Sequence, residues 1–197
     1  MEVTSAEVRT LLARAYRCDP LMTWVFPQEE HRLEAAAWLG VAVERYLARG
    51  EVDVVRDDGL AAVALWRLPE TSLDGPETLP TARGVLRAVV GAEHAAAVAR
   101  GFALAREQAP VPAHPHAYLH FLAVAPGSQR RGLGGRLLDD VLSRTRSLGV
   151  PLRLETTNPA NVPFYEAHGL RVRAEARLGD TGPVLWALDS GSGSMAR

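Results

Sequence analysis

A run of glycines and arginines is the segment whose residue types and spacing suggest binding chemistry most directly. An apolar stretch ends at Val124 and is followed by P-G-S-Q-R-R-G-L-G-G, residues 126–135, and then by helix-forming residues. Backbone N–H groups at the start of a helix bind anionic oxygens, and glycine lets the backbone approach a phosphate closely. Arg130, Arg131 and Arg136 add positive charge. The segment predicts a phosphate-binding loop, with a simple chain turn carrying solvated arginines as the alternative.

Two common nucleotide-binding motifs do not fit this segment. The dinucleotide pattern G-x-G-x-x-G requires glycine where Leu137 stands. The P-loop requires a lysine, and all 22 basic residues of the chain are arginine, which also excludes a lysine Schiff base or a lysine general base. Cys18 is the single cysteine, so an intramolecular disulfide and a zinc site with several thiolates are excluded. We expect no metal site.

Two segments together resemble the GNAT family of N-acetyltransferases. Residues 129–134, Q-R-R-G-L-G, resemble the family signature Q/R-x-x-G-x-G/A. Residues 154–170 resemble the second landmark, N-x(6)-Y-E-x-x-G-F, with Asn158 and Tyr165 in place and Leu170 where Phe is usual. The combination L-E-T-x-N-P-x-N-x-P-F-Y-E is similar to the branch that contains puromycin N-acetyltransferase. The N-terminal half of the chain matches the family only in outline.

The resemblance implies that acetyl-CoA is the co-substrate. In the family, backbone amides of the glycine loop bind the pyrophosphate, and the preceding strand hydrogen-bonds the pantetheine arm. Asn161 also stands at a helix-cap position, which is an alternative to ligand contact. The cofactor-binding residues that the resemblance indicates are Leu122, Ala123, Val124, Gln129, Arg130, Arg131, Gly132, Leu133, Gly134, Gly135, Asn158 and Asn161.

Acetyl transfer to an amine needs an acid for the leaving thiolate and a base for the amine. Tyr165 is the expected acid, because a phenol pKa near 10 lies above that of a typical thiol; a core aromatic is the alternative. Glu155 and His120 are the candidate bases, with an arginine salt bridge and a packed strand histidine as their respective alternatives. His120 should share a strand face with Tyr118, because side chains alternate along a strand.

The acceptor should lie against the N-terminal half of the chain. Large aromatic side chains could form an apolar wall for it, although such residues are more often part of a core. The candidates for this substrate-binding wall are Trp24, Phe26, Trp66 and Tyr118.

The elements that position these residues follow from periodicity and turn signals. They predict helices at 4–18, 29–49, 134–148 and 161–168, strands at 51–56, 60–68, 118–124, 151–156, 170–177 and 183–188, and a helical insertion at 81–108 interrupted at Gly91 and Gly101. Strands separated by helices favour an α/β (α+β) architecture. The resemblance implies the GNAT fold, a mixed, mostly antiparallel sheet with a splayed parallel strand pair. We expect one domain, residues 1–189, and a disordered tail, residues 190–197.

Charge and hydropathy restrict the partners. The net charge of −1 argues against nucleic acid. No apolar run approaches the roughly 20 residues needed to span a bilayer, and the N-terminus lacks a signal-peptide core, so we expect a cytoplasmic protein without membrane partners. The final strands could pair two chains in a homodimer. The leading hypothesis is direct acetyl transfer to a primary amine of a small molecule. The alternatives are an acyl-CoA sensor, a catalytically silent GNAT domain and a protein N-acetyltransferase.

Overall fold

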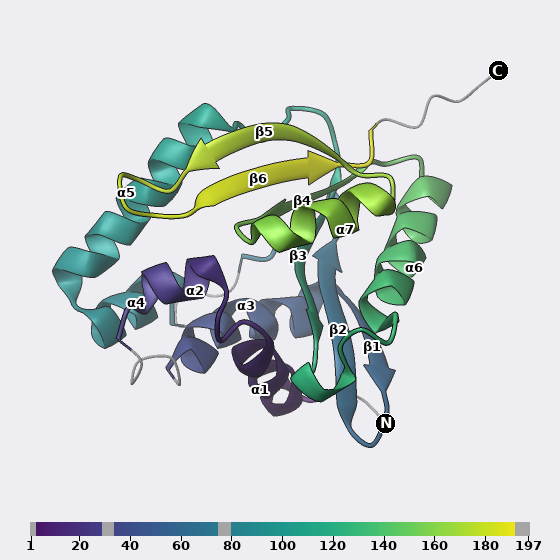
Figure 1. The fold of residues 1–197 in the computed structure, drawn as a ribbon, viewed down its shortest axis with the longest axis horizontal. Helices are drawn as coiled ribbons and strands as arrows, with labels where there is room; N and C mark the ends of the chain where they lie inside the picture. The colour runs from purple at the N-terminus through teal and green to yellow at the C-terminus, as the bar shows by residue number, and fades with distance from the viewer. Residues whose placement is uncertain (1–2, 29–33, 75–79, 192–197) are drawn as a thin grey trace.

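Six strands form one mixed sheet at the centre of the molecule (Figure 1). The computed structural model describes residues 3–28, 34–74 and 80–191. The strand order is β1-β2-β3-β4-β6-β5, in which β3 and β4 are parallel and the other neighbours are antiparallel. This is the expected mixed GNAT sheet with one parallel pair. The strands are β1 Glu51–Arg56, β2 Leu60–Arg67, β3 Ala117–Val124, β4 Leu152–Thr156, β5 Arg171–Arg177 and β6 Val184–Asp189.

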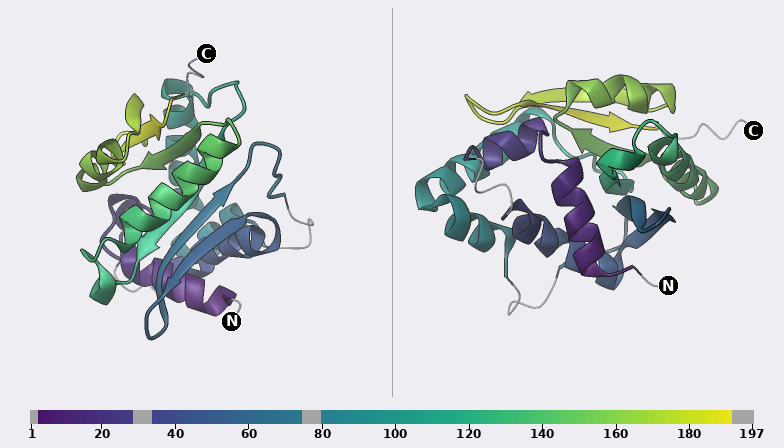
Figure 2. Two further views of the ribbon diagram at one scale, coloured as in Figure 1. Left: turned by 90° about the vertical axis from the view of Figure 1, so that its right-hand side faces the viewer. Right: turned by 60° about the horizontal axis from the view of Figure 1, so that its bottom comes forward.

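Helices cover both faces of the sheet (Figure 2). On one face, α1, α2 and α3 pack on β2 and β3 through a core that includes Leu12, Val43 and Leu65. On the other face, α6 and α7 enclose a second core with Trp66 and Leu138. The helices are α1 Ser5–Ala15, α2 Pro20–Val25, α3 Ala35–Arg49, α4 Ala82–Val90, α5 Ala92–Gln108, α6 Leu133–Ser147 and α7 Val162–Ala167.

The parallel strands β3 and β4 stay together for only part of their length. Pairing joins residues 117–119 to residues 152–154, and the described strands make no further ladder beyond that point. Beyond Leu119 the two strands therefore diverge and leave a wedge between them. The C-terminal half of β3 keeps its other neighbour, β2, as far as the pair of Ala62 with Val124.

A β-bulge at His120 lies where the divergence begins. Leu65 pairs with Phe121 and the next residue of β2, Trp66, pairs with Leu119, so His120 is an extra residue in β3. His120 and Phe121 consequently share one face, and their rings stack at a centroid distance of 4.1 Å. Bulges bend a strand, increase its twist and disrupt the local ladder. The extra residue thus accounts for the end of the β3–β4 pairing.

The backbone of Leu122 and Val124 faces the wedge. The N–H of Ala125 donates to the carbonyl of Ala61 at 2.8 Å, and alternate residues of an antiparallel strand point toward the same neighbour. Phe121, Ala123 and Ala125 therefore pair with β2, and the N–H and C=O groups of Leu122 and Val124 point away from it. The Tyr16 hydroxyl donates to the Leu122 carbonyl at 3.1 Å, in agreement with this direction.

Most predicted elements are present within a few residues, with two differences in the helices. The apolar segment after Asp19 forms α2, with Asp19 as its N-cap. Residues 29–33 of the predicted second helix lie outside the described residues, as do residues 192–197 of the predicted tail. The insertion breaks at Gly91, whose φ is 80°, as predicted. The predicted interruption at Gly101 is wrong. Helix α5 continues through Gly101. Glycine permits close packing at this position, because a Cβ would stand 2.7 Å from the Trp24 ring.

Candidate functional site

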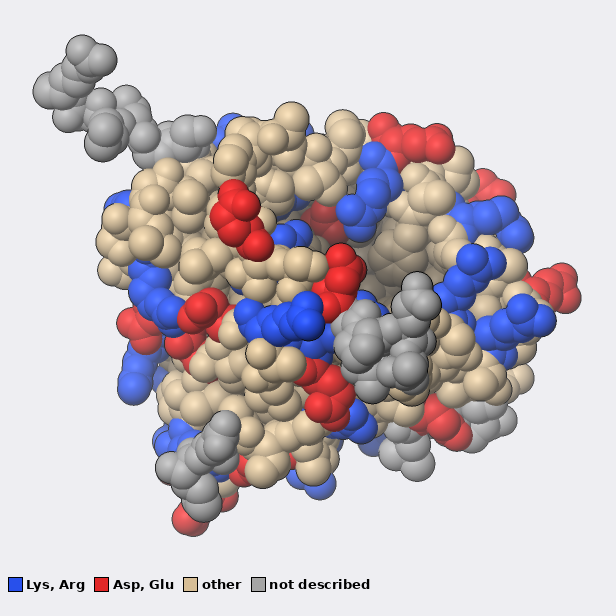
Figure 3. Space-filling model, turned by 180° about the vertical axis from the view of Figure 1, so that it is seen from behind, with Lys and Arg blue, Asp and Glu red and all other residues tan. Residues whose placement is uncertain are grey.

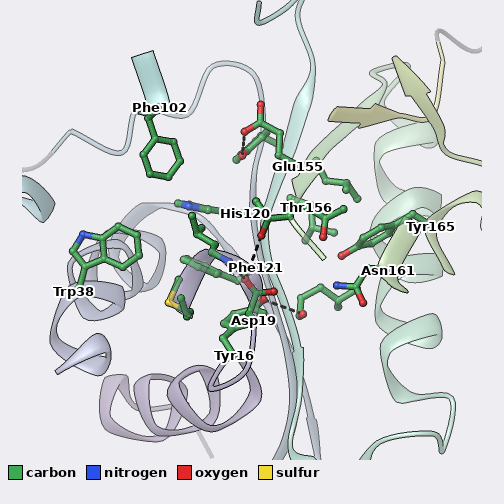
Figure 4. A pocket seen from close by; sticks show the side chains of 17 residues that line it. Tyr16, Asp19, Trp38, Phe102, His120, Phe121, Glu155, Thr156, Asn161 and Tyr165 are labelled. Atoms are coloured by element: carbon green, nitrogen blue, oxygen red, sulfur yellow. Dashed lines mark hydrogen bonds between the residues drawn. The ribbon is translucent and has the colours of Figure 1, made fainter. Parts of the chain in front are cut away.

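A cavity of about 270 Å³ opens in the wedge between β3 and β4 (Figure 4). Its volume is close to the range of small-molecule pockets. Aromatic and aliphatic side chains make up most of its wall, with a few polar groups among them. The polar and titratable lining residues are Tyr16, Asp19, Tyr118, His120, Glu155, Thr156, Thr157, Asn161 and Tyr165. All three predicted catalytic residues therefore meet in one cavity.

Tyr165 enters the cavity from α7, which packs against the sheet on the α6 side. Its side chain is 8% exposed, and its hydroxyl has no hydrogen-bond partner among the described residues. Burial, and then the nearby charge of Asp19, raise the pKa of this phenol above its usual value. Tyr165 is thus held in the protonated form with its O–H available to a ligand, as a proton donor requires.

Glu155 lies on β4 and is already engaged on both carboxylate oxygens. Its Oε1 accepts from Nη2 of the buried Arg153 at 3.4 Å, and its Oε2 accepts from the Tyr118 hydroxyl at 3.3 Å. Burial, and then the charge of Glu155, raise the pKa of Tyr118. Glu155 therefore forms the arginine salt bridge that the sequence leaves open as an alternative, and it also lines the cavity.

His120 projects into the cavity from the bulge in β3. Its ring lies among the rings of Tyr46, Tyr118 and Phe121, at centroid distances of 5.5, 5.8 and 4.1 Å. His120 is exposed along the cavity, and the protein atoms packed around its ring reduce its hydration. This desolvation, and then the charge of Arg67, lower the pKa of His120 to about 4. The imidazole is therefore neutral at physiological pH, and it is a weak base.

We predict that His120 titrates far below an ordinary histidine. In an NMR titration its imidazole signals should shift with a midpoint near 4, compared with the ordinary value of 6.5. Because the unfolded chain then binds more protons than the folded one between these values, His120 should lower stability as pH falls from 6.5 toward 4. Arg67→Gln removes a nearby cation and should raise the midpoint. A midpoint near 6.5 in the wild type would contradict the desolvated position.

Tyr16 and Asp19 are polar cavity residues that were not among the predicted site residues, as are Thr156 and Thr157. Tyr16 and Asp19 come from the end of α1 and the α1–α2 connection, opposite α7 (Figure 4). Oδ1 of Asp19 caps α2 by accepting from the N–H of Leu21 at 2.9 Å, and it also accepts from the Thr157 hydroxyl at 3.3 Å. Burial raises the pKa of Asp19. An Asp before Pro is an N-cap signal, but not a signal of cavity position.

The glycine loop ends in an open helix start that suits a phosphate group. Gly132 is the N-cap of α6 with φ 79°, a left-handed conformation that glycine adopts without strain, and no side chain caps the helix. The first intrahelical bond runs from the N–H of Arg136 to the carbonyl of Gly132 at 3.0 Å. The N–H groups of Leu133, Gly134 and Gly135 therefore need partners from outside the helix.

The loop side chains have different surroundings. Nε2 of Gln129 donates to the Val124 carbonyl at 3.3 Å, which ties the loop to the end of β3. Arg131 forms an ion pair with Asp57 at 2.7 Å and so supports the β1–β2 turn. Arg130, with φ 59°, is exposed and forms no ion pair with any described residue. Of the two arginines, Arg130 is the one available to an anion.

The two predicted asparagines have separate positions. Asn158 accepts from the N–H of Ala160 at 3.1 Å and caps the 3₁₀ turn Pro159–Asn161. Asn161 makes no side-chain cap for α7, contrary to the cap alternative, and it lines the cavity.

Of the four predicted wall residues, the structure brings Tyr118 to the cavity and leaves the other three outside its lining. Trp66 is fully buried on the α6 face, where its Nε1 donates to Asp53 at 2.7 Å. Phe26 is fully buried beside Trp38 in the core under α1 and α3. Trp24 packs on Phe102 near the C-terminal strands. Trp38, Phe102 and Phe121 supply the aromatic wall instead.

The part of the chain that the structure describes contains no helix long and apolar enough to cross a membrane. Within the same residues, no group of three or more His, Cys, Asp or Glu side chains is placed to hold a metal ion.

Comparisons with known proteins agree with this fold. Residues 84–170 match the model of the acetyltransferase (GNAT) family. A protein described as histone acetyltransferase HPA2 and related acetyltransferase from Corynebacterium glutamicum has a similar structure, with a TM-score of 0.70, 22% identity and coverage of 100% of this chain and 97% of that chain. Mosquito arylalkylamine N-acetyltransferase like 5b has a TM-score of 0.56, 18% identity and coverage of 94% and 93%. The C-terminal condensation domain of Ebony has a TM-score of 0.63, 15% identity and coverage of 94% and 92%.

The family match spans the glycine loop and Tyr165, and the similar structures share the fold across nearly the whole chain. The chain therefore has the GNAT fold, and its residues 84–170 carry the sequence pattern of the acetyltransferase (GNAT) family.

Proposed function

We propose that the protein acetylates a primary amine of a small molecule by direct transfer within a ternary complex. The observation that carries this proposal is the cavity at the β3–β4 wedge. It brings the Tyr165 hydroxyl, two carboxylates and the inward-facing backbone of β3 together within an apolar wall. A concave cavity of about 270 Å³ suits a small acceptor better than a protein surface.

The residues present fit acetyl-CoA. The three N–H groups at the start of α6, with Arg130 beside them, would hold the pyrophosphate, and the N–H groups of Leu122 and Val124 would hold the arm in the wedge. Gln129 contacts the end of β3 and Asn161 lines the cavity, so both lie beside this path. When bound, acetyl-CoA supplies the acetyl thioester at the cavity.

Each remaining step of acetyl transfer has a group in or beside the cavity that could perform it. The N–H of Val124 or Leu122 stabilises the negative charge that develops on the carbonyl oxygen during attack by the amine. The Tyr165 hydroxyl gives its proton to the thiolate sulfur as the C–S bond breaks. The proton that the nitrogen loses on forming the amide restores the phenol, so the transfer is balanced. The apolar wall of Trp38, Phe102 and Phe121 orients the acceptor and excludes water.

Several observations support a small amine acceptor. The arylalkylamine N-acetyltransferase among the similar structures acts on amines by its name, and the Ebony domain is in complex with beta-alanyl-dopamine. Acidic and basic side chains are interspersed on the face seen in Figure 3, and the net charge is −1, which argues against a nucleic acid partner. The resemblance of residues 154–166 to the puromycin N-acetyltransferase branch adds puromycin to the candidate acceptors.

We expect acetyl-CoA to bind in the micromolar range in titration calorimetry, and thiol release to rise with at least one amine. The amine panel should include puromycin, arylalkylamines, short alkylamines and a peptide with a free N-terminus. Turnover of the peptide alone would favour protein N-acetylation. Binding of acetyl-CoA without turnover of any amine would favour the sensor function. No binding of acetyl-CoA would reject the proposal.

A further inference from the structure

Three side chains in the cavity could accept a proton from the acceptor amine, and their surroundings differ. Glu155 is neutralised by the buried Arg153, and both of its oxygens accept hydrogen bonds. His120 is neutral and weakly basic, with Arg67 as a repulsive neighbour. Asp19 differs from both, because no described arginine forms an ion pair with it.

The two oxygens of Asp19 have different environments. Oδ1 accepts from the Leu21 N–H and the Thr157 hydroxyl, which fixes the carboxylate between α2 and the end of β4. Oδ2 accepts no hydrogen bond of standard geometry from the described residues, although the N–H of Met22 also lies close enough to the carboxylate to stabilise its charge. The carboxylate lines the cavity, and its charge acts on the phenols of both Tyr16 and Tyr165. The cap of α2 thus accounts for one oxygen and leaves the other for a ligand.

Building on the proposed function, we propose that Asp19, rather than Glu155 or His120, binds the acceptor ammonium and takes its proton. The ammonium donates a hydrogen bond to Oδ2, and one N–H bond then breaks as an O–H bond forms on the carboxylate. This transfer leaves a neutral amine and a neutral carboxyl group opposite Tyr165, and the nitrogen lone pair is free to attack the thioester carbon. After the acetylated product leaves, the carboxyl group releases its proton to solvent and Asp19 returns to the carboxylate form. The acceptor is therefore an amine that enters the cavity as a cation.

The surroundings of Asp19 favour this transfer. Burial shifts both a carboxylate and an ammonium toward their neutral forms, and it raises the pKa of Asp19. The groups that face Asp19 are the phenols of Tyr16 on α1 and Tyr165 on α7 and the hydroxyl of Thr157 after β4. His120 and Glu155 line the same cavity from β3 and β4.

The test compares Asp19→Asn with the wild type on two acceptors. The asparagine Oδ1 can still accept from Leu21 and Thr157, so the cap is kept while the charge and the proton acceptor are lost. For an alkylamine, which is a cation at neutral pH, we expect kcat/KM to fall by about 100-fold or more, the usual contribution of a general base. For an arylamine of similar shape, which is neutral at that pH, we expect a loss below about tenfold, because no proton must leave before attack.

Three controls accompany the test. Asp140→Asn removes an exposed carboxylate on α6 and should leave both acceptors unaffected. Glu155→Gln should not discriminate between the acceptors. Thermal unfolding and calorimetric binding of acetyl-CoA should match the wild type for Asp19→Asn, which separates a chemical effect from a folding defect.

The outcomes are distinct. Equal losses for the two acceptors in Asp19→Asn, or selective loss of the alkylamine in Glu155→Gln, would overturn the assignment while the proposed function stands. A wild type that acetylates neither amine would overturn the proposed function and the role of Asp19 with it.

Discussion

Replacement of Tyr165 by Phe should abolish most of the acetyl transfer while leaving acetyl-CoA binding intact. The change removes one oxygen from a side chain that is already buried on the α6 side of the sheet, so the fold should be retained. That oxygen has no hydrogen-bond partner in the described protein, and its proton is the one we assign to the leaving thiolate. We expect kcat to fall by about 100-fold or more, which is typical for loss of a general acid. The measurement is thiol release at saturating acceptor.

Tyr118→Phe is the matched control, because it deletes the same atom from the same cavity. The Tyr118 hydroxyl donates to Glu155 at 3.3 Å and is not assigned a proton in the reaction. Its loss should change kcat by less than about tenfold, in line with loss of one hydrogen bond. If Tyr165→Phe keeps wild-type turnover, or if the two variants lose activity equally, Tyr165 is not the acid.

Gly134→Val should abolish acetyl-CoA binding. A Cβ at Gly134 would stand 3.4 Å from Cγ2 of Val124 and 3.9 Å from the Phe164 ring, at the point where β3 meets α6. Two more methyl groups there would occupy the space in front of the N–H groups that we assign to the pyrophosphate. Each hydrogen bond to a charged group contributes about 1.5–3 kcal/mol. We therefore expect at least a 100-fold weaker Kd in titration calorimetry, about 2.7 kcal/mol.

Gly127→Val makes the same substitution in the same loop, at a position where a Cβ would meet no atom within 4 Å. This control should bind acetyl-CoA within a few-fold of the wild type. Equal affinity of Gly134→Val and the wild type would show that the phosphates do not bind at the start of α6. Thermal unfolding of both variants distinguishes lost binding from lost structure.

The sequence predicted the C-terminal half of the molecule well because its signals are local. A strand, a glycine loop and a helix start are encoded in neighbouring residues. Tyr165 and Glu155 lie on elements whose order along the chain matches the family. Tyr118 and His120 share a strand face in the structure, as alternation requires. The positions of these residues in the cavity follow from local signals and depend little on how distant segments of the chain pack.

The aromatic wall could not be predicted in the same way. In β2 almost every residue is buried, so the hydropathy pattern gives no indication of which face Trp66 occupies. Trp24 and Phe26 lie around a six-residue helix whose orientation depends on tertiary packing. Asp19 reaches the cavity only because α1 and α2 fold against β3. The cytoplasmic location, the domain limits and the homodimer stay predictions.

The bulge at His120 has a consequence for protein design. Pairing of β2 with β3 is in register on both sides of the extra residue, with Trp66 opposite Leu119 and Leu65 opposite Phe121. The single extra residue in β3 therefore coincides with the point at which the sheet opens between β3 and β4. An engineer who wishes to install a ligand site in a closed mixed sheet could insert a single residue into a central strand and let the added twist separate it from its parallel neighbour.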